Sequence, residues 1–166
     1  MKWLISSILI MLSLVVPTLL IVKEVKFNQN CGGYLKQAAD ANTPELALER
    51  INVAVNYIES RHLTEGYTSV MWRTEAENVE FWYRNIIACR DELQSCLNSS
   101  QLEKTNVLMK VRESLTDDSN GSVSLTIPLG ISRYPHNFTW AVMVTLSIFI
   151  FLVGVGCVLC AVLKGS

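Results

Sequence analysis

WAVMVTLSIFIFLVGVGCVLCAVL, residues 140–163, is an apolar run without a charged residue. About 20 such residues cross the hydrocarbon core of a bilayer as a helix. A helix that packs on a soluble core carries a polar stripe on its outer face, and this run has none. A second apolar run, Trp3 to Val22, lies near the other end of the chain. The two runs predict transmembrane helices that flank one extramembrane region.

The first run differs from a cleaved signal peptide. Its apolar stretch after Lys2 is longer than the roughly 7 to 15 residues of a signal-peptide core, and no A-x-A cleavage site follows it. We therefore interpret residues 1–22 as an uncleaved transmembrane signal anchor. Residues 23–139 form the extramembrane domain, 140–163 the second transmembrane helix and 164–166 a short tail.

The charge of the domain excludes one class of partner. Among residues 23–139, 12 Lys and Arg face 15 Asp and Glu, which gives a net charge of −3. Because the basic residues form no cluster, we expect no binding of nucleic acid. The basic residues flanking the spans do not decide the orientation. The export-like start and three cysteines in the domain favour cytoplasmic termini and an extracytoplasmic domain, periplasmic or extracellular.

The domain contains three well-marked helices, and residues 34–41 suit a short fourth one. Thr43 is a good N-cap before Pro44, and an apolar stripe continues to about Leu63. Thr74 and Glu77 form a capping-box pattern for the next helix. Its apolar seam then alternates steps of three and four residues: Val79, Trp82, Ile86, Cys89, Leu93 and Cys96. A third helix is expected from Ser100 to about Thr116.

Two further stretches, 66–72 and 122–127, have strand-like composition. If the three helices rise, return and rise again, the 64–73 loop and the 117–121 turn meet at the end of the domain far from the membrane. We expect the two stretches to pair there. The predicted fold is therefore mostly α, with two transmembrane helices flanking a bundle of about three to four helices and a small β element.

The cysteines allow one disulfide in the domain. Cys89 and Cys96 are seven residues apart on one helix, which places them about 10 Å apart, beyond the reach of a disulfide. Any bridge must involve Cys31, and Cys31 with Cys96 is the preferred pair because both are expected near the membrane. Alternatively, Cys89 and Cys96 are small buried hydrophobic residues on the seam.

No catalytic pattern is present in the sequence. There is no Ser, His and acid set, no glycine-rich phosphate loop and no CxxC motif in the domain, and His62 and His136 lack ligand spacing. A nucleophile built from Cys31 and His62 is a weak alternative. We predict that the protein is not an enzyme and uses no cofactor or metal.

Aromatic residues give the best signal for binding. Phe81, Trp82 and Tyr83 are consecutive, about 100° apart around a helix, so they do not all face one core. Tyr, Trp and Met are enriched in protein interfaces. We expect five residues to contact a partner, namely Tyr67, Met71, Trp72, Phe81 and Tyr83. The alternative is that helices of the same domain cover them.

The second apolar run also carries small residues four apart, a spacing that lets membrane helices approach closely. We predict helix packing through Gly154, Gly156, Cys157, Cys160 and Ala161. Because the bilayer disfavours a thiolate, the intramembrane CxxC is not expected to have a redox role.

These features predict a non-enzymatic membrane-anchored subunit or scaffold. It would act through protein–protein interaction of its helical domain and membrane helices, with other membrane-protein subunits or with further copies of itself. The alternative is a ligand-sensing or regulatory membrane subunit, because two spans around a helical bundle is the layout of bacterial chemoreceptor input domains. An apolar pocket inside the bundle would favour sensing, whereas an exposed aromatic surface would favour a scaffold.

Overall fold

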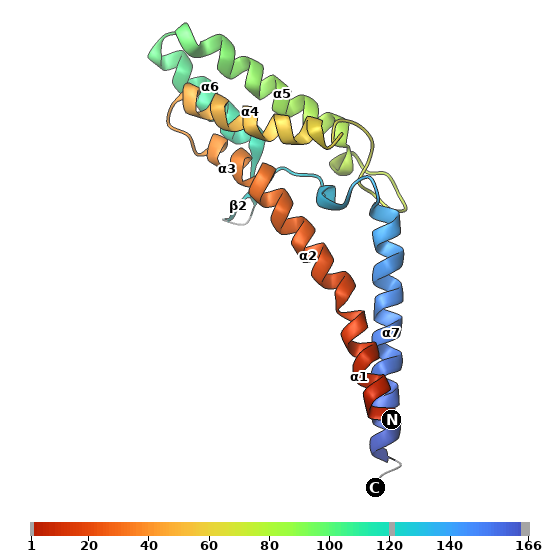
Figure 1. Cartoon of the computed structure of the whole chain (residues 1–166). Coiled ribbons are helices and arrows are strands. Elements are labelled where there is room, and N and C mark those ends of the chain that lie inside the picture. The colour runs from red at the N-terminus through yellow and green to blue at the C-terminus, as the bar shows by residue number, and fades with distance from the viewer. Residues whose placement is uncertain (1, 120–121, 164–166) are drawn as a thin grey trace.

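The structure is a computed structural model that describes residues 2–119 and 122–163. Two long apolar helices carry a mostly helical domain at one end (Figure 1). The first consists of α1 (Lys2–Ser13) and α2 (Val15–Phe27), and the second is α7 (Asn137–Leu163). Both termini lie at the end away from the domain, and α1 runs beside α7.

Both apolar helices are long enough to cross a membrane. They cover Ser6–Ala39 and Asn137–Cys160, and only 6% and 11% of their most apolar stretches are buried. The core helix of a soluble domain would be mostly buried, so these helices present open apolar surfaces. The predicted pair of long apolar helices is confirmed.

The N-terminal helix continues into the domain, and the short helix expected at residues 34–41 is its direct extension. It passes through a π-helical turn (Asn28–Gly32) into α3 (Gly33–Ala39). A Cβ atom on Gly33 would lie 2.9 Å from the backbone oxygen of Asn28, so the close approach inside the turn requires glycine. The glycine pair therefore permits a wider turn and does not end the helix.

The domain core is built by α3 with α4 (Pro44–Ser60), α5 (Val79–Ser95) and α6 (Gln101–Leu115). Thr43 caps α4 as predicted, because its Oγ1 accepts a hydrogen bond from the Leu46 N–H at 3.3 Å. The predicted seam of α5 is also confirmed. All six of its residues are buried: Val79, Trp82, Ile86, Cys89, Leu93 and Cys96.

The start of α5 differs from the prediction. Thr74 donates a side-chain hydrogen bond to Glu77 at 2.7 Å, but these residues flank only a short 3-10 turn (Glu75–Glu77). The α-helix begins at Val79, where Asn78 Oδ1 accepts from the Phe81 N–H at 3.0 Å. Asn is as good an N-cap as Thr, so the sequence contains two adjacent signals for a helix start, one at Thr74 and one at Asn78. The α-helix begins after the second one.

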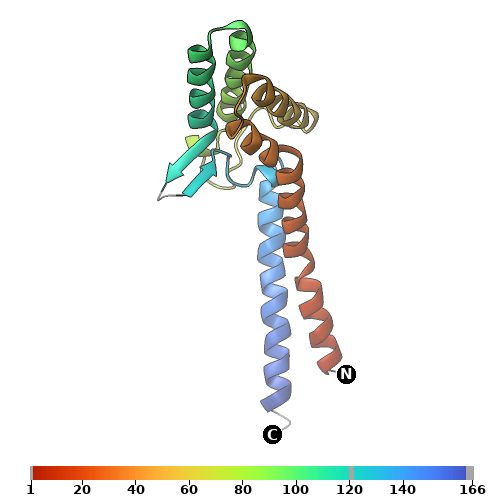
Figure 2. The same ribbon diagram turned by 90° about the vertical axis from the view of Figure 1, so that its left-hand side faces the viewer.

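The small β element is present, but its partners differ from the expected ones. β1 (Thr116–Ser119) pairs antiparallel with β2 (Ser122–Leu125), so Thr116 faces Leu125 and Ser119 faces Ser122. The hairpin projects from the side of the domain (Figure 2). In the other stretch, only Tyr67 forms a bridge, and it does so with Asn78. The predicted pairing of 66–72 with 122–127 is therefore wrong.

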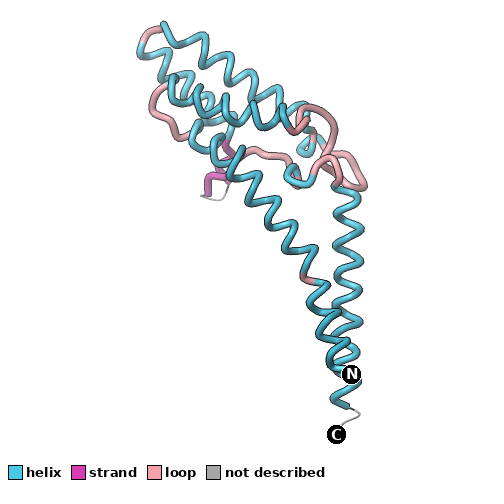
Figure 3. The backbone as a smooth tube through the Cα atoms, viewed as in Figure 1, coloured by secondary structure: helices cyan, strands magenta, loops and turns pink. Residues whose placement is uncertain are grey.

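The direction of the domain is also the reverse of the expected one. Figure 3 shows the loop between α4 and α5 beside the segment that leads into α7, and the turn between α5 and α6 at the far end. The expected rise and return of the three helices placed this loop at the opposite end of the domain. The 64–73 loop therefore lies at the start of α7, not at the distal tip.

Candidate functional site

Two side chains, Tyr134 just before α7 and Asn137 at its first position, hold the 64–73 loop in place. Asn137 is buried, and its Nδ2 donates to the backbone oxygen of Thr68 at 2.6 Å. The hydroxyl of Tyr134 donates to the backbone oxygen of Glu65 at 2.8 Å. These contacts join residues 69 positions apart in the chain, so no local pattern in the sequence indicates them.

The five predicted partner-binding residues fall into two groups. Met71, Trp72 and Phe81 are 75%, 76% and 65% exposed. Tyr67 and Tyr83 are half-buried and have partners within the chain. The structure therefore leaves three of the five side chains open for a partner.

The contacts of the two tyrosines are specific. The guanidinium of Arg73 lies 5.3 Å from the centre of the Tyr67 ring. The hydroxyl of Tyr83 donates to Glu59 Oε1 at 2.7 Å, and this hydrogen bond raises the pKa of Tyr83. Tyr83 thus ties α5 to α4, and Trp82 between it and Phe81 is in the core. The side chain of Tyr83 therefore has a partner within its own domain, and its contact with another protein stays a prediction.

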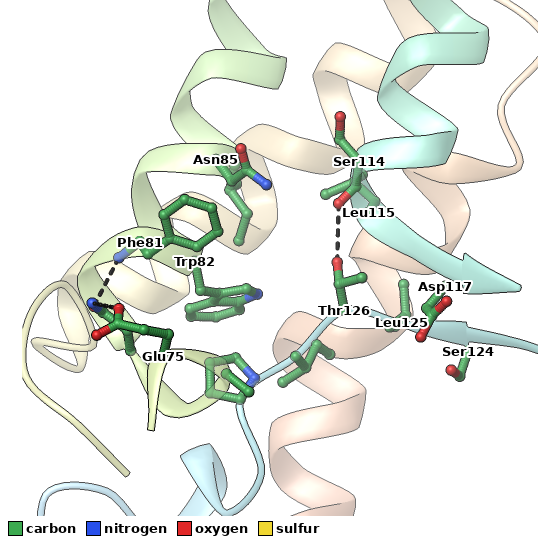
Figure 4. A pocket seen from close by; sticks show the side chains of 15 residues that line it. Glu75, Phe81, Trp82, Asn85, Ser114, Leu115, Asp117, Ser124, Leu125 and Thr126 are labelled. Atoms are coloured by element: carbon green, nitrogen blue, oxygen red, sulfur yellow. Dashed lines mark hydrogen bonds between the residues drawn. The ribbon is translucent and has the colours of Figure 1, made fainter. Parts of the chain in front are cut away.

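Phe81 forms one wall of a groove of about 370 Å³ on the outside of the domain (Figure 4). The groove lies between the start of α5, the end of α6 and the segment after β2. Trp82 and Pro128 contribute further apolar surface. Thr126 Oγ1 donates to the Ser114 backbone oxygen at 3.0 Å and fixes the β2 side of the groove to α6.

The charged residues that line this groove are all acidic. Glu75 and Asp117 line it from opposite elements, and its lining contains no Lys, Arg or His. Glu75 accepts a hydrogen bond from Asn78 Nδ2 at 3.3 Å. An apolar floor with carboxylates at the edge suits a partner segment that carries an apolar side chain beside basic ones.

The three cysteines of the domain are free and buried thiols, and the structure contains no disulfide among its described residues. Cys31 lies in the π turn, whereas Cys96 begins the 3-10 turn (Cys96–Asn98) that joins α5 to α6 at the far end of the domain. The predicted Cys31–Cys96 bridge is therefore absent, because its basis, a shared position near the membrane, does not hold. Burial raises the pKa of the Cys31 thiol to about 12, and burial also raises the pKa of Cys89.

The residues predicted for membrane-helix packing lie in different surroundings. A Cβ atom on Gly154 would lie 3.1 Å from Ile10 Cγ1, so Gly154 brings α7 close to α1. Gly156 has open space where a Cβ would be, and Cys157 and Cys160 are exposed. The side chain of Ala161, like the 164–166 tail, lies outside the described part of the structure.

A second contact between α1 and α7 was not predicted from the sequence. Pro17 has no N–H, so it cannot bond to the backbone oxygen of Ser13 four residues earlier. The hydroxyl of Ser147 on α7 donates to that same oxygen, and both serines are buried. The signal visible in the sequence is a proline within one apolar run, which leaves a backbone oxygen without its helical N–H, together with a serine within the other run.

The described residues hold no group of three or more His, Cys, Asp or Glu side chains placed to bind a metal ion. Comparison of the chain with protein-family models, with curated proteins and with solved structures finds no match.

Proposed function

We propose that this protein is a non-enzymatic membrane-anchored scaffold or subunit whose helical domain binds a partner protein through the Phe81 groove. In this proposal α1–α2 and α7 both cross the bilayer. Their length, their open apolar surface and the location of both termini at one end support this placement. The Nζ of Lys23 lies 5.1 Å from the Trp140 ring, a pair typical of the membrane–water boundary.

The proposed orientation has both termini in the cytoplasm and the domain outside it. Its basis is the start of the chain, where Lys2 precedes an apolar run as in an export signal. The buried thiols carry no information on this point, because they are shielded from solvent on either side of a membrane.

One observation carries the binding proposal, namely that Phe81 is 65% exposed beside an apolar groove with an acidic edge. A large aromatic ring next to a concave apolar surface is typical of the central residues of an interface. Other membrane-protein subunits or further copies of this chain would supply the complementary basic and apolar segment.

Photo-crosslinking in intact cells tests this proposal. A photoreactive phenylalanine at position 81 is compared with the same group at Leu102, which is 74% exposed on α6. We expect one defined protein adduct from position 81, reproduced from Ser124 on the opposite side of the groove, and none from position 102. Equal yields from positions 81 and 102, or no adduct from either groove position, would contradict partner binding at the groove.

Ligand sensing is the second candidate, and the continuous path from α2 through the π turn into α3 favours it. Phe27 and Leu35 on this path are both in the domain core. A displacement of α2 in the membrane would therefore reach the core directly.

A further inference from the structure

A cleft of about 490 Å³ lies between α2, the end of α4 and the segment that leads into α7. Three basic side chains line it, from Lys23 and Lys26 on α2 and from Arg61 after α4, and His136 is also part of the lining. The cleft is separate from the Phe81 groove, because the two share no lining residue.

Lys23, Lys26 and Arg61 take part in none of the ion pairs found among the described residues. Lys23 faces the Trp140 ring at 5.1 Å and Arg61 faces the Tyr57 ring at 5.7 Å. Contacts with aromatic faces orient a cation and leave its charge in place.

The lining of the cleft contains no carboxylate. Glu24, next to Lys23 in the sequence, is outside the lining, and its carboxylate accepts a hydrogen bond from Ser132 Oγ, which lines the cleft. Three cations around a concavity without an acid are unexpected in a domain whose net charge is −3. Such an arrangement favours the binding of an anion, and Arg and Lys are the usual protein ligands of a phosphate group.

The opposite end of the cleft is apolar. Leu19 and Val22 line it on α2, on the side that continues into the long apolar helix. One site therefore joins a basic end facing the domain to an apolar end facing the helices. A free phosphate ion would use only the first end, whereas an anionic lipid would use both.

We propose that this cleft binds one anionic phospholipid, with the phosphate of the headgroup among Lys23, Lys26 and Arg61 and the acyl chains along α2. The inference rests on the proposed membrane anchoring, which places the Lys23–Trp140 pair at the level of lipid headgroups. It goes beyond that proposal by assigning a ligand class to the cleft. Binding needs no covalent step.

The full-length protein in lipid nanodiscs tests this site. Nanodiscs of dioleoyl phosphatidylcholine containing a minor fraction of dioleoyl phosphatidylglycerol are used, and native mass spectrometry counts the lipids that stay bound. The double variant Lys23→Gln with Arg61→Gln is compared with Arg84→Gln with Arg112→Gln, which removes the same charge from exposed positions elsewhere. Flotation with vesicles and the melting temperature verify that each variant is anchored and folded.

We expect one phosphatidylglycerol retained by the wild type and by the control variant. The cleft variant should bind it roughly 25-fold more weakly, because it lacks two basic groups and each one near an anionic lipid contributes about fivefold. Equal retention by both variants would overturn the site, since the attraction would then be general. Displacement of the lipid by millimolar inorganic phosphate would overturn the lipid assignment and indicate a free anion.

Separate outcomes would refute the membrane anchoring and the lipid site. A wild-type protein that does not float with phosphatidylcholine vesicles would refute the anchoring, and the lipid site with it. A protein that floats but shows no preference for phosphatidylglycerol would refute the lipid site alone.

Discussion

The hydroxyl of Ser147 should stabilise the pairing of α1 and α7 only because Pro17 leaves a backbone oxygen free. Ser147 donates to the Ser13 oxygen in a buried position, and Pro17 cannot supply the N–H that would bond to this oxygen within a regular helix. In the variant Ser147→Ala this oxygen loses its partner. Hydrogen bonds between membrane helices contribute about 0.6 to 2 kcal/mol, and a buried unpaired carbonyl costs about 1 to 3 kcal/mol. We expect a loss of about 1 to 2 kcal/mol.

The variant Pro17→Ala changes this expectation. It restores an N–H that can bond to Ser13 within the helix, so the bond from Ser147 becomes redundant. In the Pro17→Ala background, Ser147→Ala should cost about 0.5 kcal/mol or less. The double-mutant cycle therefore predicts a coupling energy of about 1 kcal/mol between two residues on different helices.

The assay is reversible unfolding of the full chain by dodecyl sulfate in mixed micelles. Energy transfer between labels at the two termini reports the helix pair, because both termini lie at one end of the molecule. Thr145→Ala is the matched control, since Thr145 Oγ1 donates to the Ala141 oxygen of its own helix at 3.0 Å and is exposed. Equal costs of Ser147→Ala in both backgrounds would refute the reasoning, and so would a control that costs as much as Ser147→Ala.

Three other perturbations follow from the structure. Gly154→Ile should weaken the α1–α7 pair by about 1 to 3 kcal/mol in the same assay, because its side chain meets α1, whereas Gly156→Ile in open space should change it little. Gly66→Ala should lower the free energy of unfolding of the domain by about 2 kcal/mol or more, because φ is +94° at this residue and a Cβ atom would lie 2.2 Å from the Tyr134 hydroxyl. Thermal denaturation measures this change, and an unchanged melting temperature would contradict it. An impermeant maleimide should leave Cys31 unlabelled between pH 7 and 9, because burial raises the pKa of its thiol to about 12 and little thiolate forms in this range. A control cysteine at the exposed position of Leu102 (Leu102→Cys) should react faster as the pH rises. Labelling of Cys31 in the folded protein at pH 7 would contradict this prediction.

The local features of the fold could be predicted from the sequence. The seam of α5 repeats every three and four residues, and the Thr43–Pro44 start of α4 depends only on adjacent residues. Such signals do not depend on the rest of the chain. The β1–β2 hairpin also has a local signal, because Asn120 and Gly121, which lie between the two strands in the sequence, are the residue pair most typical of a two-residue hairpin turn.

Long-range features could not be predicted in this way. Helix lengths are the same whether the 64–73 loop faces the membrane or points away from it, so the direction of the domain had no local signature. It is fixed by the bonds of Asn137 to Thr68 and of Tyr134 to Glu65. The expected Cys31–Cys96 disulfide depended on that direction, so it is also absent from the structure. Among the candidate binding residues, exposure alone separates Phe81 from Tyr83, and sequence spacing does not give exposure.

The two apolar helices enter the domain without flexible linkers. α2 continues through the π turn into α3, so Phe27 and Leu35 share one core. α7 is fixed at its first residue, where Asn137 Nδ2 also donates to the Gly130 oxygen at 3.1 Å. A change in the angle between the helices must therefore displace one of these buried contacts. Because the basic cleft lies between the same two attachments, its width depends on how α1 and α7 pair, and a bound headgroup would in turn act on that pairing. This mechanical link is what the sensing candidate requires, whereas a scaffold requires only the groove.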